Sequence, residues 1–164
     1  MLTSTHPTPT IDAFGAIDSL DFEQIAFKAN RTRLKKHADT QATSVDQDIQ
    51  AYKNFLKLVA SHPGRELVPT EEIDEIWHMH ILDTQRYRPD CEMIFGQMLE
   101  HYPYFGIKDS MDQHQLMRAF AETQALYRET FSDGAYDKAD ATRCKGHACH
   151  APTPCRCRTP GACK

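Results

Sequence analysis

Long hydrophobic runs and glycine are both scarce in this chain of 164 residues, which has only seven glycines. No apolar run approaches the roughly 20 residues that a membrane-spanning helix needs, so no membrane partner is predicted. The first ten residues have no Lys or Arg and no apolar core, which argues against a signal peptide. We therefore expect a cytoplasmic protein, in which cysteines stay reduced and bind metal more often than they form disulfides.

The sequence also lacks the short motifs of several common enzyme classes. GxGxxG, the P-loop, GxSxG and HExxH are all absent. Nucleotide-dependent chemistry and serine hydrolysis therefore have no basis in the sequence. The net charge of −4 gives no overall attraction to nucleic acid either.

Charge and cysteine are distributed unevenly along the chain. Residues 141–164 contain five basic residues and no acidic one, so this segment carries +5 and the rest of the chain −9. Five of the six cysteines also lie there, among prolines and glycines that exclude a helix or strand of useful length. The sequence thus predicts a disordered lead over 1–15, one helical body over 16–136 and a basic Cys/His-rich tail over 137–164.

Hydrophobic spacing within the body is typical of helices, and no segment alternates as a strand would. Capping boxes are expected at Ser44 to Gln47 and at Ser110 to Gln113, with Thr70 as a further N-cap. Pro89 is expected to interrupt a helix. The fold class predicted is all-α, a compact bundle of about five helices with a disordered N-terminal lead and a Cys-rich irregular C-terminal tail. The helices are expected to cover about 20–35, 44–62, 70–88, 90–101 and 110–131.

The richest stretch for chemistry runs from Ile73 to His101 and contains the only Trp of the chain. Its centre is Trp77-His78-Met79-His80, which has the donor types of a transition-metal or proton-transfer site. On a regular helix His78 and His80 point about 200° apart, so this pair cannot chelate one ion. Each histidine therefore needs partners of its own.

Two interpretations of His80 are open. It lies three residues before Asp83, and Cys91 or His101 could complete an open three-ligand site of the kind that catalytic zinc or non-haem iron uses. Cys91 is placed at an expected helix start, which would lower the pKa of its thiol. The alternative is that this lone Cys is a buried small residue without a chemical role. Alternatively, His80 is structural and hydrogen-bonds within the core to Asp83, Thr84 or Tyr87.

Asp74 lies four residues before His78 and has two interpretations as well. The simpler one is a pair on the solvent side of the helix. The other is catalytic, with the Asp74 carboxylate orienting the His78 imidazole for proton transfer.

The tail provides the second chemical signal, because thiols and imidazoles are dense there. Soft ligands at this density suit Zn(II) or Cu(I), although the spacing matches no standard zinc finger. Alternatives are incidental thiols, disulfide formation under oxidising stress, or contact of the basic tail with a protein partner. Without interleaved aromatic residues, nucleic-acid binding is not predicted. The tail residues expected to bind metal are Cys144, His147, Cys149, His150, Cys155, Cys157 and Cys163.

Several uncommon residues of the body follow one another in a distinctive order: Pro69, Ile73, Asp74, Trp77, His78, His80, Leu82, Asp83, Thr84, Tyr87, Asp90, Cys91, His101, Pro103, Phe105, Gly106, Thr123, Tyr127 and Phe131. This order resembles the glycine-rich domain protein family, which includes large plant proteins and small stand-alone bacterial ones. The resemblance covers about residues 20–131. This chain has no glycine-rich segment, so nucleic-acid binding by such a segment is not carried over.

Three functions from different classes fit these features. The first is a helical module that binds zinc or copper, chiefly through the tail. The second is a small metal-dependent enzyme with its site at the WHxH region. The third is a protein-interaction domain whose tail is redox-sensitive.

Overall fold

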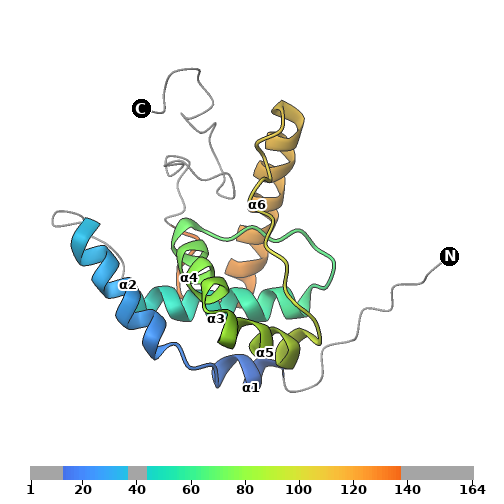
Figure 1. The fold of residues 1–164 in the computed structure, drawn as a ribbon. Coiled ribbons are helices and arrows are strands. Elements are labelled where there is room, and N and C mark those ends of the chain that lie inside the picture. The colour runs from blue at the N-terminus through green and yellow to red at the C-terminus, as the bar shows by residue number, and fades with distance from the viewer. Residues whose placement is uncertain (1–12, 37–43, 138–164) are drawn as a thin grey trace. The chain divides into compact units, whose positions relative to one another are not determined.

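A computed structural model describes residues 13–36 and 44–137 (Figure 1). These residues form six helices and no strand, which confirms the all-α prediction. Chain contacts divide the protein into two units, the first made of residues 1–65 and 75–100 and the second of residues 66–74 and 101–164. Within the described ranges, no helix combines the length and the hydropathy that a membrane span requires.

The first unit begins with a helix that was not expected from the sequence. Helix α1, Ala13–Asp18, starts inside the segment expected to be disordered, and its Ile17 is fully buried. It contacts both α3 and α5, while α2 contacts α3. Burial against these longer helices stabilises a segment too short to be helical alone. The helices of this unit after α1 are α2 (Glu23–Lys36), α3 (Val45–Ser61), most of α4 (Glu71–Leu82) and α5 (Thr84–Phe95).

Helix α3 follows its sequence signals closely. The Ser44 hydroxyl accepts from the Gln47 N–H at 3.2 Å, and the Gln47 side chain accepts from the Ser44 N–H at 3.3 Å, so the predicted capping box is confirmed. The expected apolar stripe is buried at Tyr52, Phe55 and Leu56. These side chains give the unit its core.

The break between α4 and α5 lies upstream of the proline that was expected to cause it. The chain leaves the helix at Asp83, whose N–H bonds the carbonyls of both Met79 and His80, and whose own carbonyl accepts from Tyr87. Pro89 lies inside α5, in its second turn. There it removes one backbone hydrogen bond without ending the helix.

The end of α5 also differs from the expectation that a helix runs to His101. It ends at Phe95, because Gly96 adopts a left-handed conformation with φ of 68° and its N–H closes the last turn on Glu92. Residues 97–109 therefore form a long connection, and His101 lies in this loop instead of on a helix.

The second unit contains the first turn of α4 and the whole of α6, Ser110–Thr130. Asp109 caps α6 by accepting from the Asp112 N–H, one residue before the capping box expected from the sequence. The core of the second unit joins distant parts of the chain. The Val68 N–H donates to Thr123 at 3.0 Å, and the Tyr136 hydroxyl donates to the Val68 carbonyl at 2.8 Å.

Candidate functional site

Asp74 lies in the first turn of α4 and is buried, with 1% of its surface exposed. Thr70 starts this turn, since its carbonyl accepts from the Asp74 N–H and its hydroxyl from the Ile73 N–H. The interpretation of Asp74 and His78 as a solvent-side pair is therefore wrong for the aspartate. An ionised carboxylate at this depth requires a charged or hydrogen-bonding partner.

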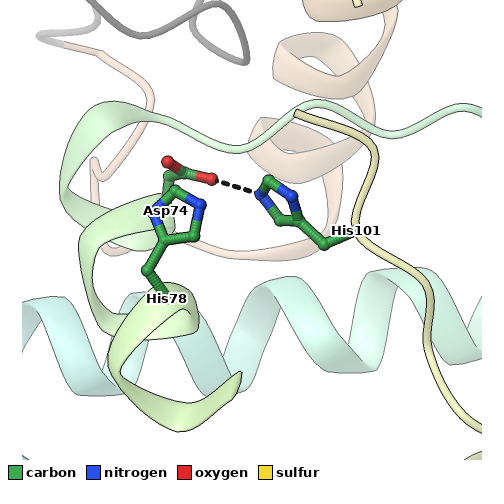
Figure 2. Close-up of side chains that lie close together, drawn as sticks. All are labelled: Asp74, His78 and His101. Carbon is green, nitrogen blue, oxygen red and sulfur yellow. Dashed lines mark hydrogen bonds and ion pairs between the residues drawn. The ribbon is translucent and has the colours of Figure 1, made fainter. Parts of the chain in front are cut away.

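His101 is one such partner. Its Nε2 lies 2.8 Å from the Asp74 Oδ1, and its side chain is 9% exposed (Figure 2). A carboxylate can only accept, so Nε2 carries the proton of this hydrogen bond. The loop after α5 thus brings to Asp74 a histidine that lies 27 residues later in the sequence.

His78 completes a cluster with these two residues. It lies on the same helix one turn after Asp74, so the helix holds the two side chains on one face. The division between the two units falls just after Asp74. One ligand atom from each of the three residues lies within 4.8 Å of the others, and both histidines are half-buried. Figure 2 shows the His101 imidazole directed at the Asp74 carboxylate and the His78 imidazole close beside Asp74. Among the described residues, this group could hold a metal ion.

The donor set restricts the chemistry of such an ion. Two imidazoles and one carboxylate match the three-ligand sites of catalytic zinc and of non-haem iron(II). Both kinds of site leave at least one position for water or substrate. Copper(I) prefers thiolate or thioether ligands, which this cluster does not contain.

His80, the expected metal ligand, takes part in a different network. Its Nε2 lies 3.0 Å from the Asp90 Oδ2, and its Nδ1 lies 3.0 Å from the Tyr52 hydroxyl. Asp90 can only accept when ionised, so Nε2–H donates to it and the neutral ring accepts the Tyr52 proton at Nδ1. Both ring nitrogens are therefore occupied by protein partners.

Burial and ring packing also support a structural role for His80. His80 is 2% exposed, and its ring meets those of Phe22, Tyr52 and Tyr87 edge-on, with centroids 4.9 to 5.9 Å apart. Burial lowers the pKa of His80 below its ordinary value, against the opposing effect of Asp90. The folded protein thus favours a neutral imidazole, as a core hydrogen-bond network requires.

The two other ligands expected at this body site, Asp83 and Cys91, lie in separate environments. Asp83 lies at the break before α5, 3.8 Å from Arg86. Cys91 is buried in the interior of α5 and not at a helix start, and burial raises the pKa of its thiol, opposite to the lowering expected. Within the described residues, neither belongs to the cluster of Asp74, His78 and His101.

Trp77 is a buried anchor of the core. Its indole N–H donates to the Tyr87 hydroxyl at 3.0 Å, Tyr87 donates to the Leu99 carbonyl, and the indole packs against Phe55. These contacts hold Leu99, which lies two residues before His101 in the connection after α5. The loop is therefore held close to α4 just before its histidine.

Tyr52 and Asp90 were not recognised as functional partners in the sequence. Tyr52 is 28 residues from His80, and Asp90 is ten residues away on the next helix, so no short spacing joins them. Only the packing of α3, α4 and α5 identifies the pair. The tail ligands, from Cys144 to Cys163, lie outside the described residues.

Gly106 closes the loop that carries His101. Its φ is +80°, and an added Cβ would lie 2.5 Å from the Leu116 Cδ2 on α6. Gly106→Ala should therefore lower the free energy of unfolding by about 2–3 kcal/mol, from strain and overpacking together. Urea denaturation measures this loss. Gly64→Ala is the matched control, because Gly64 has the same φ but no atom near the added Cβ. An equal loss in both variants would contradict the role of the Leu116 contact.

Comparison with known proteins supports the resemblance seen in the sequence. The UCP032817-like family model matches residues 14–133. The chain is 34% identical over 101 residues to glycine-rich domain-containing protein 1 of Arabidopsis thaliana, and 32% identical over 101 residues to glycine-rich domain-containing protein 2 of that plant. Each match covers 59% of this chain but only 12% of the plant protein.

No solved structure matches the chain significantly. The family match spans most of the described residues, including both histidine networks. The likeness to the glycine-rich domain-containing proteins is thus confirmed, and the chain belongs to the UCP032817-like family.

Proposed function

We propose that this protein binds a divalent transition-metal ion, zinc(II) or iron(II), through Asp74, His78 and His101. The observation that carries the proposal is the convergence of one buried carboxylate and two half-buried imidazoles within 4.8 Å. An ion bound there would take the place of the proton that joins His101 to Asp74. The negative charge of Asp74 would then be balanced by the metal, which offsets its burial.

The geometry supports this position over the one expected from His80. The ring nitrogens of His80 already bond Tyr52 and Asp90, so a metal would have to break a buried network. At the cluster, a metal would take the place of the hydrogen bond between His101 and Asp74 and would be coordinated by all three residues. The role of the helix is to hold two ligands one turn apart, as in other helical metal sites.

A metal-dependent reaction is the second candidate function, and one observation favours it. Three protein ligands leave a tetrahedral ion with one further position, where a water would bind and become more acidic. Both histidines are only partly buried, so we expect such a position to have access to solvent. Any such reaction would depend on the ion, so removal of the metal would abolish it.

The tail would be a second source of ligands. Its five thiols and two imidazoles suit zinc(II) or copper(I), provided that the compartment is reducing, as the cytoplasm is. Its basic charge also suits a protein partner with an acidic surface. The body cluster and the tail therefore need separate measurements.

Metal titration of the full-length chain tests the body site. The tail cysteines are first replaced by serine, so that any tight binding reports on the body. We expect one zinc ion to bind, and His101→Ala to weaken it by about 100-fold or more. Titration calorimetry at pH 7 measures both values.

His114→Ala is the matched control, because His114 is exposed on α6 and bonds the Ser110 carbonyl of its own helix. It should leave the affinity unchanged. Equal weakening by both substitutions, or no zinc binding before either, would overturn the proposed body site. The interaction-domain hypothesis would then become the leading one.

A further inference from the structure

The connection from α5 to α6 carries His101, one of the three proposed metal ligands, and contains no helix or strand of its own over residues 97–109. Holding such a segment in one conformation costs conformational entropy for every residue that is ordered. A ligand on this loop binds an ion tightly only when other contacts have already placed it, because the ordering cost otherwise lowers the affinity. The contacts that place His101 before an ion binds are therefore part of the metal site.

The Tyr87 hydroxyl joins this loop to α4 within the first unit. It accepts from the Trp77 indole N–H at 3.0 Å and donates to the Leu99 carbonyl at 2.5 Å. Both aromatic side chains are buried. Burial also raises the pKa of Tyr87, so its hydroxyl keeps the proton that it donates to Leu99.

The two residues that Tyr87 joins both lie beside proposed metal ligands in the sequence. Trp77 directly precedes His78 on α4. Leu99 lies two residues before His101, and two residues of extended chain span at most about 7 Å. The hydrogen bond at Leu99 therefore restricts where the His101 backbone can lie, and the imidazole then meets the proposed carboxylate ligand at 2.8 Å.

We propose that Tyr87 is a positioning residue of the metal site, whose hydroxyl holds Leu99 and thereby sets the place of His101. This inference rests on the proposed metal site. The cluster that could hold the ion consists of other residues, so Tyr87 acts on the affinity through the loop. Without its hydroxyl, the ion would have to order the loop on binding, and the affinity would fall.

The ring and the hydroxyl of Tyr87 have different partners, so their roles can be separated. The ring packs edge-on against the His80 imidazole, with centroids 4.9 Å apart. Tyr87→Phe keeps this ring and removes only the hydroxyl, with its bonds to Trp77 and Leu99. The variant therefore retains the packing of the core while the loop loses these hydrogen bonds to α4.

Tyr127→Phe is the matched control for the loss of a hydroxyl. Tyr127 is also buried, and its hydroxyl donates to the Asp133 carboxylate at 2.7 Å. That bond joins the end of α6 to the residues after it and lies outside the loop of residues 97–109. Circular dichroism and a denaturation midpoint show that each variant folds.

Zinc titration calorimetry on the full-length chain, with the tail cysteines replaced by serine, tests the inference. We expect Tyr87→Phe to weaken zinc binding about 10-fold, the lower end of the effect of residues that orient metal ligands. Tyr127→Phe should leave the zinc affinity of this tail-serine chain unchanged, because its hydroxyl does not contact the loop.

Backbone order in the loop provides a second measurement, which needs no substitution in the body. Nitrogen-15 relaxation of the metal-free tail-serine chain should give order parameters of about 0.85 at residues 99–101, as in rigid backbone. Tyr87→Phe should lower them toward about 0.6, the range of flexible backbone. Values below about 0.6 before any substitution, rising only when zinc is added, would show that the ion orders the loop and would overturn the inference.

The outcomes separate this inference from the proposed metal site. Absence of zinc binding by the tail-serine chain would overturn the metal site itself, and the inference with it. Zinc binding that is weakened by His101→Ala but unchanged in folded Tyr87→Phe would overturn the inference alone. Equal weakening by Tyr127→Phe would assign the effect to lost stability and would overturn the inference as well.

Discussion

Replacement of His80 by alanine is expected to lower the free energy of unfolding by about 3–5 kcal/mol. The change leaves the buried Tyr52 hydroxyl without its acceptor and removes the Nε2–H that donates to the Asp90 carboxylate, which costs about 1–3 kcal/mol. It also leaves a cavity among three aromatic rings, whose lost packing adds a comparable amount. Urea or thermal denaturation measures the sum.

His114→Ala provides the control for this loss. His114 is exposed and bonds the carbonyl of its own helix, so its removal should change stability by less than about 0.5 kcal/mol. Zinc affinity should stay at the native value in folded His80→Ala. A stability loss below about 1 kcal/mol, or loss of zinc binding by the folded variant, would contradict a structural role for His80.

The same residue should give the protein a pH-dependent stability. The pKa of His80 is lowered in the folded state by burial, while an unfolded histidine titrates near 6.5. Below about pH 6.5 the unfolded chain binds more protons than the folded one, so the free energy of unfolding falls as the pH falls. Asp90 and Asp83 oppose this effect and Arg86 adds to it. Denaturation between about pH 7.5 and 5.5 should show a smaller slope in His80→Ala.

Asp74→Asn is expected to abolish tight zinc binding while leaving the fold intact. The amide has the same shape and its oxygen can still accept from His101, so the hydrogen bond between the loop and α4 is kept. The charge is lost, however, and a neutral amide is a poor ligand for zinc. The affinity should fall by on the order of 100-fold or more.

Titration calorimetry on the tail-serine background measures this change. Glu122→Gln removes the same charge from an exposed position on α6 and should leave the affinity unchanged. Circular dichroism and a denaturation midpoint close to that of the native chain show that the variant folds. Native zinc affinity in folded Asp74→Asn would exclude the carboxylate as a ligand.

The two histidines of the WHxH motif thus serve different networks because of helix geometry. His78 and His80 point to nearly opposite sides of α4, so one joins Asp74 and the other joins Tyr52 and Asp90. A single motif therefore contributes both a candidate metal ligand and a structural residue of the core.

Much of this protein was determined by local sequence. The capping box at Ser44, the cap at Thr70 and the apolar stripes depend on residues within one or two helical turns, and they are confirmed. The separation of His78 from His80 follows from the helical repeat alone. Where local signals compete, as at Pro89, the predicted helix boundaries were wrong. The free-energy cost of a proline in the second turn is smaller than the stabilisation that α5 gains from packing.

The partners of each histidine were decided only by the tertiary structure. His101 reaches Asp74 across 27 residues, because Gly96 ends α5 early and the loop returns to the start of α4. Tyr52 reaches His80 from another helix altogether. Such pairs carry no periodic signal, since the free energy that selects them comes from packing of distant segments and from the need to satisfy buried polar groups.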